Sequence, residues 1–155
     1  MKKYKFTGET KTIYLPFGTV TLHRIKAVVE FRFVKVGDLG GWIEKEENLS
    51  HEENAWVYGN AEVRGNAWVC GNAKVFSTDH VLVIGAIGSR NDFTTFFRDK
   101  DNEITVKCGC FLGKIDKFLK KVTQTHKDTK HTLVYRTAVE VAKLQIDLMG
   151  KSTRR

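Results

Sequence analysis

The sequence is poor in residues that cross-link a chain and has no stretch that could carry it through a membrane. Its 155 residues include one proline and three cysteines, Cys70, Cys108 and Cys110. A sparse, odd number of cysteines argues against a disulfide scaffold and favours a reducing compartment. No apolar run approaches the roughly 18 residues of a membrane-spanning helix. The N-terminus also lacks the apolar core of a secretory signal. We therefore expect a cytoplasmic protein.

Charge is unevenly distributed along the chain. The net charge of +8 comprises +6 in residues 1–37, −5 in residues 38–97 and +7 in residues 98–155. Two interpretations remain open. Complementary lobes could pack against each other, or the basic ends could form a surface for a phosphate-bearing partner such as a nucleotide or nucleic acid.

A six-residue repeat dominates the stretch ENAWVYGNAEVRGNAWVCGNAKVF, residues 53–76. A period of six fits neither an amphipathic helix nor a plain strand. It fits a solenoid in which six residues form one side and a corner. Glycine followed by asparagine recurs at the predicted corners, where positive φ is needed. The inward apolar positions are Val57, Val63, Val69, Val75, Val81, Ile87 and Phe93; the small positions are Ala61, Ala67 and Ala73; and the corner glycines are Gly59, Gly65 and Gly71.

The repeat also carries aromatic residues at positions that point outward. Three sides make a coil of about 18 residues, so residues one coil apart should stack. Tyr58 is then predicted to lie against Phe76, and Trp56 against Lys74. Exposed aromatics require a cover, so we expect Trp56, Tyr58, Trp68 and Phe76 to be covered by the rest of the chain or by another copy of it.

These residues resemble the hexapeptide-repeat family, whose fold is the left-handed parallel β-helix. The resemblance is specific over residues 53–76 and extends to about residue 93. It implies about two coils, supplied by residues 57–92. The segments KVGDLGGWIEKEENLS, NAWVYGNAEV and IGSRNDFTTFFR, with CGCF further on, are also similar to uncharacterised phage and prophage proteins. That second resemblance covers roughly residues 20–145 and implies a phage accessory protein without established chemistry.

The remaining segments predict a mainly β fold in a single domain, residues 1–155. Apolar and β-branched residues on both sides of Pro16-Phe17-Gly18 indicate a strand pair. Helical spacing of apolar residues from Ile115 and from Val134 indicates two C-terminal α-helices, with Gly150 as a stop. We expect an N-terminal β lobe (1–42), a short left-handed β-helix core (43–97), a β-hairpin (98–112) and a helical cap (113–149).

Candidate catalytic and metal-binding residues are scattered. His51 or His80 could serve as the general base of an acyltransferase, although two coils form a short wall for a pantetheine arm. His126 and His131 have a spacing unsuited to one helix face, and Cys108-Gly-Cys110 lacks partners at ligand spacing. We therefore expect neither a catalytic residue nor a metal or other cofactor.

The segment IGSRNDFTTFF, residues 87–97, is the first candidate for a site, because polar groups gather there within an apolar frame. Arg90 offers a planar fork that suits phosphate or carboxylate. Phe93, Phe96 and Phe97 are predicted as walls of the site. The alternative is a capped exit from the solenoid, with Asp92 paired to Arg90 or capping backbone amides. The predicted ligand-binding residues are Ser89, Arg90, Asn91, Asp92, Thr94 and Thr95.

We expect from this sequence a phage-encoded, non-enzymatic binding protein that acts against host defence in the host cell cytoplasm. It would sequester a small anionic or nucleotide signal, or block a host defence protein. Alternatives are a hexapeptide-type acyltransferase, supported by fold analogy, and a direct nucleic-acid binder. Exposed aromatics on a short solenoid further predict a homo-oligomer.

Overall fold

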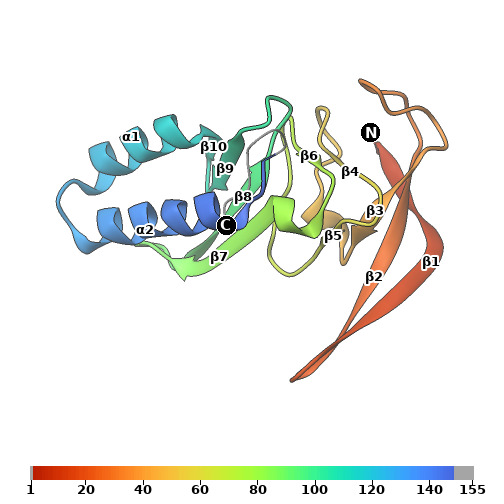
Figure 1. Cartoon of the computed structure of the whole chain (residues 1–155), viewed down its shortest axis with the longest axis horizontal. Coiled ribbons are helices and arrows are strands. Elements are labelled where there is room, and N and C mark those ends of the chain that lie inside the picture. Colours follow the sequence, from red (N-terminus) through yellow and green to blue (C-terminus); the bar gives the residue numbers. More distant parts are fainter. Residues whose placement is uncertain (1, 149–155) are drawn as a thin grey trace.

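The computed structural model describes residues 2–148, and these form mainly strands with two helices near the C-terminal end. A long hairpin and the helices lie at opposite ends of the molecule, with the repeat between them (Figure 1). No helix within the described part is long and apolar enough to cross a membrane.

The N-terminal strands form the predicted hairpin. β1 (Tyr4–Leu15) pairs antiparallel with β2 (Gly18–Ala27), and the chain turns at Pro16 and Phe17. β2 then pairs with β3 (Leu39–Ile43), whose neighbour on the other side is β5 (Glu62–Val63). This sheet therefore runs from the hairpin directly into the repeat.

The repeat consists of two successive passes of the chain that touch in parallel at three places. Ile43 of β3 pairs with Val63 of β5, and Leu49 forms a bridge to Val69. β4 (Trp56–Val57) pairs with β6 (Lys74–Val75). The first two contacts join residues 20 apart and the third joins residues 18 apart. The first pass therefore starts at Ile43 and contains two additional residues between Leu49 and Val57.

The predicted inward and corner positions are confirmed over this stretch. The valines at 57, 63, 69 and 75 and the alanines at 61, 67 and 73 are all buried. The three corner glycines adopt positive φ. The rings of Tyr58 and Phe76 stack with centroids 4.3 Å apart, and Trp56 pairs with Lys74. Residues one coil apart therefore lie against each other as predicted.

The N-terminal segments cover the repeat on one side. The Trp56 ring is 1% exposed and packs edge-on against Phe31 and Tyr4, with centroids at 5.3 and 6.2 Å. Trp68 and Phe76 stay partly exposed, each beneath a cation: Lys107 over Trp68 and Arg98 over Phe76. The same chain thus provides much of the cover that these aromatics require.

The parallel contacts end after Val75, and the prediction that the repeat continues to Phe93 is wrong. β7 (Val81–Ile87) and β8 (Asp92–Arg98) instead form an antiparallel hairpin. β9 (Ile104–Cys108) and β10 (Phe111–Lys114) complete a second sheet in the order β10-β9-β8-β7. The apolar residues that continue the six-residue spacing therefore belong to an ordinary sheet.

Two helices cover one face of the second sheet and form its hydrophobic core (Figure 1). α1 (Ile115–His126) and α2 (Lys130–Gln145) agree with the predicted helical segments. α2 ends at Gln145, and Gly150 lies outside the described residues. The left-handed twist of the repeat and the division into lobes of one domain stay predictions.

Candidate functional site

A cleft of about 320 Å³ opens where the β7–β8 turn, the β9–β10 turn and the two helices meet. Its apolar floor includes Phe111, Phe118 and Val122. Polar side chains from the two turns and from both helices surround this floor. The cleft therefore combines an apolar base with groups that can hold a charged ligand, as small-molecule sites commonly do.

The sequence located part of this cleft. Ser89, Arg90 and Asp92 of the predicted site line it. Asn91 sits between them in the β7–β8 turn with φ of 50°, and its side chain is exposed. The Asp92 carboxylate accepts the backbone N–H of Phe93 at 2.8 Å, which is the amide-capping role considered for it. The turn thus presents a cationic fork and a carboxylate at the mouth of the cleft.

Thr94 and Thr95 are buried within β8, at 1% and 2% exposure, and lie outside this cleft lining. Their side chains point to opposite faces, as strand geometry requires. The Thr94 hydroxyl donates to the Cys108 sulfur at 3.3 Å, whereas the Thr95 hydroxyl accepts the backbone N–H of Trp68 at 3.0 Å. Thr94 thus holds Cys108, which lines the cleft, and Thr95 joins the second sheet to the repeat.

The three phenylalanines of the segment do not form walls of the cleft. Phe96 is fully buried in the core beneath the helices, and Phe97 is fully buried in the core of the repeat. Phe93 is 37% exposed and is not among the residues that line the cleft. Because adjacent residues of a strand face opposite ways, Phe96 and Phe97 anchor β8 in two cores at once.

Tyr135 and Cys108 form the inner wall of the cleft. The Cys108 thiol donates to the Tyr135 hydroxyl oxygen at 4.0 Å. Burial raises the pKa of Tyr135 to about 12, with a further contribution from Cys108. The phenol therefore stays protonated at neutral pH. Its hydroxyl lies against the backbone of Gly88, where a Cβ would overlap it.

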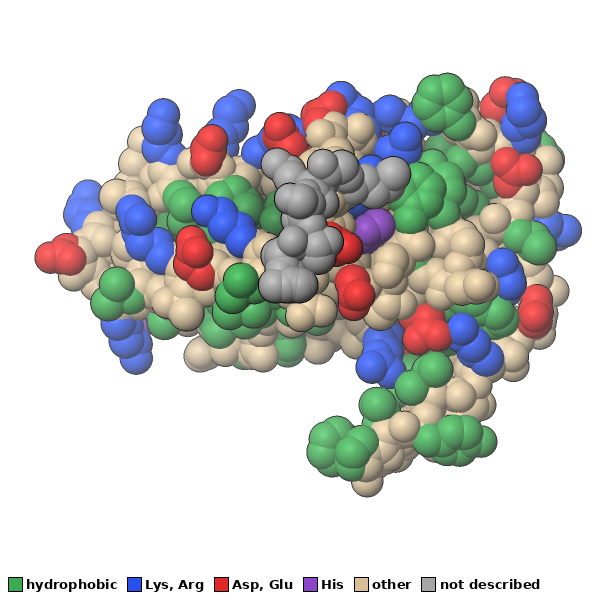
Figure 2. All heavy atoms as spheres, viewed as in Figure 1, with side chains coloured by type: hydrophobic (Ala, Val, Ile, Leu, Met, Phe, Trp, Pro, Cys, Tyr) green, Lys and Arg blue, Asp and Glu red, His purple; other side chains and the backbone are tan. Residues whose placement is uncertain are grey.

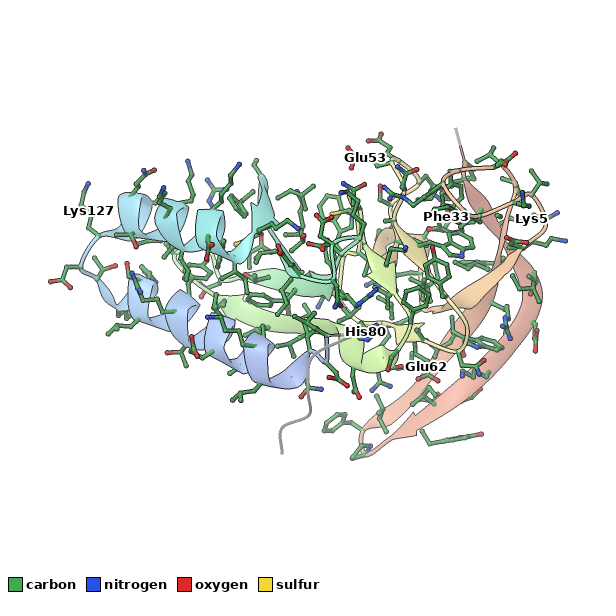
Figure 3. The ribbon with its side chains drawn as sticks, turned by 45° about the horizontal axis from the view of Figure 1, so that its top comes forward. Lys5, Phe33, Glu53, Glu62, His80 and Lys127 are labelled. Carbon is green, nitrogen blue, oxygen red and sulfur yellow. The ribbon has the colours of Figure 1, made fainter. Side chains whose placement is uncertain are left out.

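Lys121 and His126 from α1 complete the cleft, and neither was predicted from the sequence to share a site with Arg90. The His126 ring stacks on Tyr135, with centroids 5.8 Å apart, and lies 5.3 Å from the ring of His131. Figure 3 labels Lys127, the next residue, at the far end of the helices. The available signal in the sequence was the cationic side of an amphipathic helix, and such a side by itself indicates only a face exposed to solvent.

His51, one of the two predicted bases, has both ring nitrogens engaged. Its Nδ1 accepts the backbone N–H of Lys3 at 3.0 Å, so the ring proton is on Nε2, which faces a Glu46 carboxylate oxygen at 2.9 Å. The ring also stacks on Tyr4 at 4.0 Å. An imidazole held in this way connects the N-terminus to residues 46–51 and has no free lone pair for a substrate.

His80, the other predicted base, is buried where the repeat meets the second sheet (Figure 3). Its Nδ1 accepts the backbone N–H of Phe76 at 3.0 Å. Burial and the charge of Arg98 lower its pKa. Neither predicted base is therefore positioned for general-base catalysis. Of the histidines in the sequence, His126 is the one that lines the cleft.

No group of three or more metal-ligating side chains occurs between residues 2 and 148. Cys108 is half-buried and Cys110 is exposed. Gly109, between them, takes positive φ in the tight β9–β10 turn. The two cysteines border the cleft as thiols.

No family model matches the chain. The sequence is 39% identical over 62 residues to a protein of Escherichia coli (strain K12) named uncharacterized acetyltransferase YdcK. The matched stretch is 37% of this chain and 19% of that protein. This similarity agrees in broad terms with a hexapeptide-repeat protein. This similarity contradicts the prediction that the chain is not an enzyme, because the relative is named an acetyltransferase and so points toward an enzyme.

Proposed function

We propose that the protein is an acyltransferase whose acyl donor binds in the cleft between the β7–β8 turn and α1. The observation that carries this proposal is that Arg90 and Lys121 line the same cleft as His126. Two cations suit the phosphates of a coenzyme A thioester. An imidazole beside them can remove a proton from the acceptor.

The cleft residues have distinct roles in the transfer. Arg90 and Lys121 hold the anionic part of the donor, and the apolar floor receives its thioester end. His126 takes the proton from the acceptor amine or hydroxyl as its nitrogen or oxygen bonds to the thioester carbon. The carbon–sulfur bond then breaks, and the proton passes to the departing thiolate. The products are the acylated acceptor and the free thiol of the donor.

The similarity to the E. coli acetyltransferase supports transfer over sequestration, although it covers 19% of that protein. The engaged nitrogens of His51 and His80 favour the cleft over the repeat as the place of chemistry. We also propose that the two passes of the repeat have the left-handed twist of the hexapeptide family. The small anionic partner expected from the sequence is here the acyl donor. The counter-defence role that was the main expectation from the sequence, and the alternative of nucleic-acid binding, have no support in the comparisons.

Replacement of Arg90 tests the binding half of this proposal. Loss of a charge-assisted hydrogen bond costs about 1.5–3 kcal/mol, so Arg90→Ala should weaken acetyl-coenzyme A binding about ten- to hundredfold in isothermal titration calorimetry. Lys120→Ala is the matched control, because Lys120 is an exposed cation of α1 outside the cleft lining. Equal affinities of wild type and Arg90→Ala would exclude this cleft as the donor site.

Replacement of His126 tests the chemical half. With a panel of amine acceptors and mass-spectrometric detection of released coenzyme A, His126→Gln should lower turnover about 10²–10⁴-fold while leaving donor affinity within about twofold. His131→Gln, at the neighbouring imidazole, should retain turnover. Undiminished turnover in His126→Gln would contradict its role as the base.

A further inference from the structure

The β1–β2 hairpin projects beyond the body of the molecule. β3 pairs with β2 only between His23 and Lys26, so residues 12–21 form a two-stranded ribbon without a third strand. Each of its two strands has about five residues at about 3.4 Å per residue, so the ribbon extends on the order of 15 Å. Figure 1 shows it as a slender arm that points away from the rest of the chain.

The end of this arm is apolar and uncharged. Its ten residues, TIYLPFGTVT, contain no charged side chain, although 28% of the whole sequence is charged. Phe17 is 92% exposed and Tyr14 is 80% exposed, so the chain itself does not cover them. Figure 2 shows hydrophobic side chains at the end of this projection. Two aromatic rings on an extended arm indicate a contact with another molecule.

An apolar groove of about 370 Å³ lies at the opposite end of the protein, between β7 and α2. One of its lining residues is a threonine, and none is charged. Leu133 on its rim is 67% exposed and Val141 is 42% exposed. The apolar residues that line the groove are Ile84, Ile87, Leu133, Val134, Ala138 and Val141.

The arm and the groove complement each other. Neither surface has a charged side chain, although the chain has a net charge of +8. An acidic partner would therefore find no complementary charge on either. Each aromatic ring of the arm can bury roughly 150–250 Å², and a groove of this volume has room for one or both rings. Because Phe17 and Tyr14 stay exposed in the single chain, the arm does not fill its own groove.

We propose that the arm end of one copy inserts its Phe17 and Tyr14 into the β7–α2 groove of a second copy. Such a contact is heterologous, because the two copies contribute different surfaces, and repetition closes it into a ring or extends it into a filament. This inference is independent of the proposed acyl transfer, since neither surface includes the cleft residues Arg90, Lys121 and His126.

Single substitutions at the two surfaces test the proposal by analytical ultracentrifugation. Phe17→Ser and Leu133→Glu should each convert the wild-type oligomer to monomer. Their matched controls are Phe33→Ser and Leu144→Glu, which alter residues 78% and 89% exposed elsewhere on the chain, and both should sediment as wild type does. A monomeric wild type at the highest attainable concentration would overturn the proposal.

Mixing the two variants gives the sharper test. Phe17→Ser retains an intact groove and Leu133→Glu retains an intact arm, so an equimolar mixture should form a one-to-one dimer and stop there. Arm-to-arm pairing would instead survive in Leu133→Glu alone, and contact with an unrelated protein would leave the mixture monomeric. Either of these results would contradict the head-to-tail contact.

Discussion

Gly88 and Tyr135 are the pair of residues on which the cleft depends most directly. Gly88 has φ of 81°, a conformation that costs L side chains about 1–2 kcal/mol. A side chain there would also overlap the Tyr135 hydroxyl. The glycine therefore allows the tyrosine to close the inner wall of the cleft beside Cys108.

Gly88→Ala should lower the free energy of unfolding by about 2–5 kcal/mol, the combined cost of backbone strain and overpacking. Gly109→Ala is the control, since Gly109 also has positive φ but has open space around its Cβ position. It should cost only about 1–2 kcal/mol. Urea denaturation measures both. Removal of the hydroxyl in Gly88→Ala/Tyr135→Phe should recover part of the loss, and equal costs at the two glycines would contradict the overlap.

His80 makes stability depend on pH in the neutral range. Burial, and then Arg98, lower its folded-state pKa below the ordinary value of 6.5. The unfolded chain thus binds a proton more readily, and stability falls as pH drops from 6.5 toward the folded-state pKa.

The urea midpoint of the wild type should therefore decrease between about pH 7.5 and about pH 5.5. In His80→Gln, whose amide oxygen can still accept the Phe76 N–H, the decrease should be smaller. Glu46, whose pKa is lowered by His51 and then Lys2, titrates below this window. The same pH dependence in both proteins would show that His80 is not the titrating group.

At the scale of elements, β8 holds the two halves of the protein together. Phe96 lies in the core beneath the helices and Phe97 in the core of the repeat, and both are fully buried. The β8 backbone also pairs with β7 and β9. We therefore expect a substitution on either face of β8 to destabilise both cores.

Phe96→Ala and Phe97→Ala should each cost about 3–5 kcal/mol, as truncations of buried aromatics do. Chemical denaturation of each variant should be followed by two signals. Circular dichroism reports the helices, and tryptophan fluorescence reports the repeat, since Trp42, Trp56 and Trp68 all lie within residues 42–68. Phe93→Ala, at a partly exposed position of the same strand, should cost much less.

At the scale of the whole molecule, the same measurement tests the prediction of a single domain. If residues 2–148 unfold as one unit, the two signals of each Phe variant change at the same denaturant concentration. Separate midpoints, with Phe96→Ala affecting only the helical signal, would instead divide the chain into two domains. The uneven distribution of charge along the sequence is compatible with one domain or with two, so it does not predict which result will be found.

Patterns that repeat over a few residues were enough to predict several parts of this protein. They include the buried valines and alanines of residues 57–75, the corner glycines, the turn at Pro16-Phe17-Gly18 and the two C-terminal helices. Each follows from local backbone preference or from side chains on one face of one segment. The planar fork of the Arg90 side chain likewise suggested an anion-binding group, and that role stays a prediction.

Only the tertiary structure decided where the repeat starts and ends, and which residues meet in the cleft. A spacing of six is also a multiple of the two-residue strand period, so Val81, Ile87 and Phe93 suit an ordinary strand equally well. Two additional residues before Val57 concealed Ile43 and Leu49 as the first inward positions. Arg90 lines the same cleft as Lys121 and His126 because α1 folds back over the second sheet. That packing depends on contacts between segments far apart in the sequence, which no local pattern specifies.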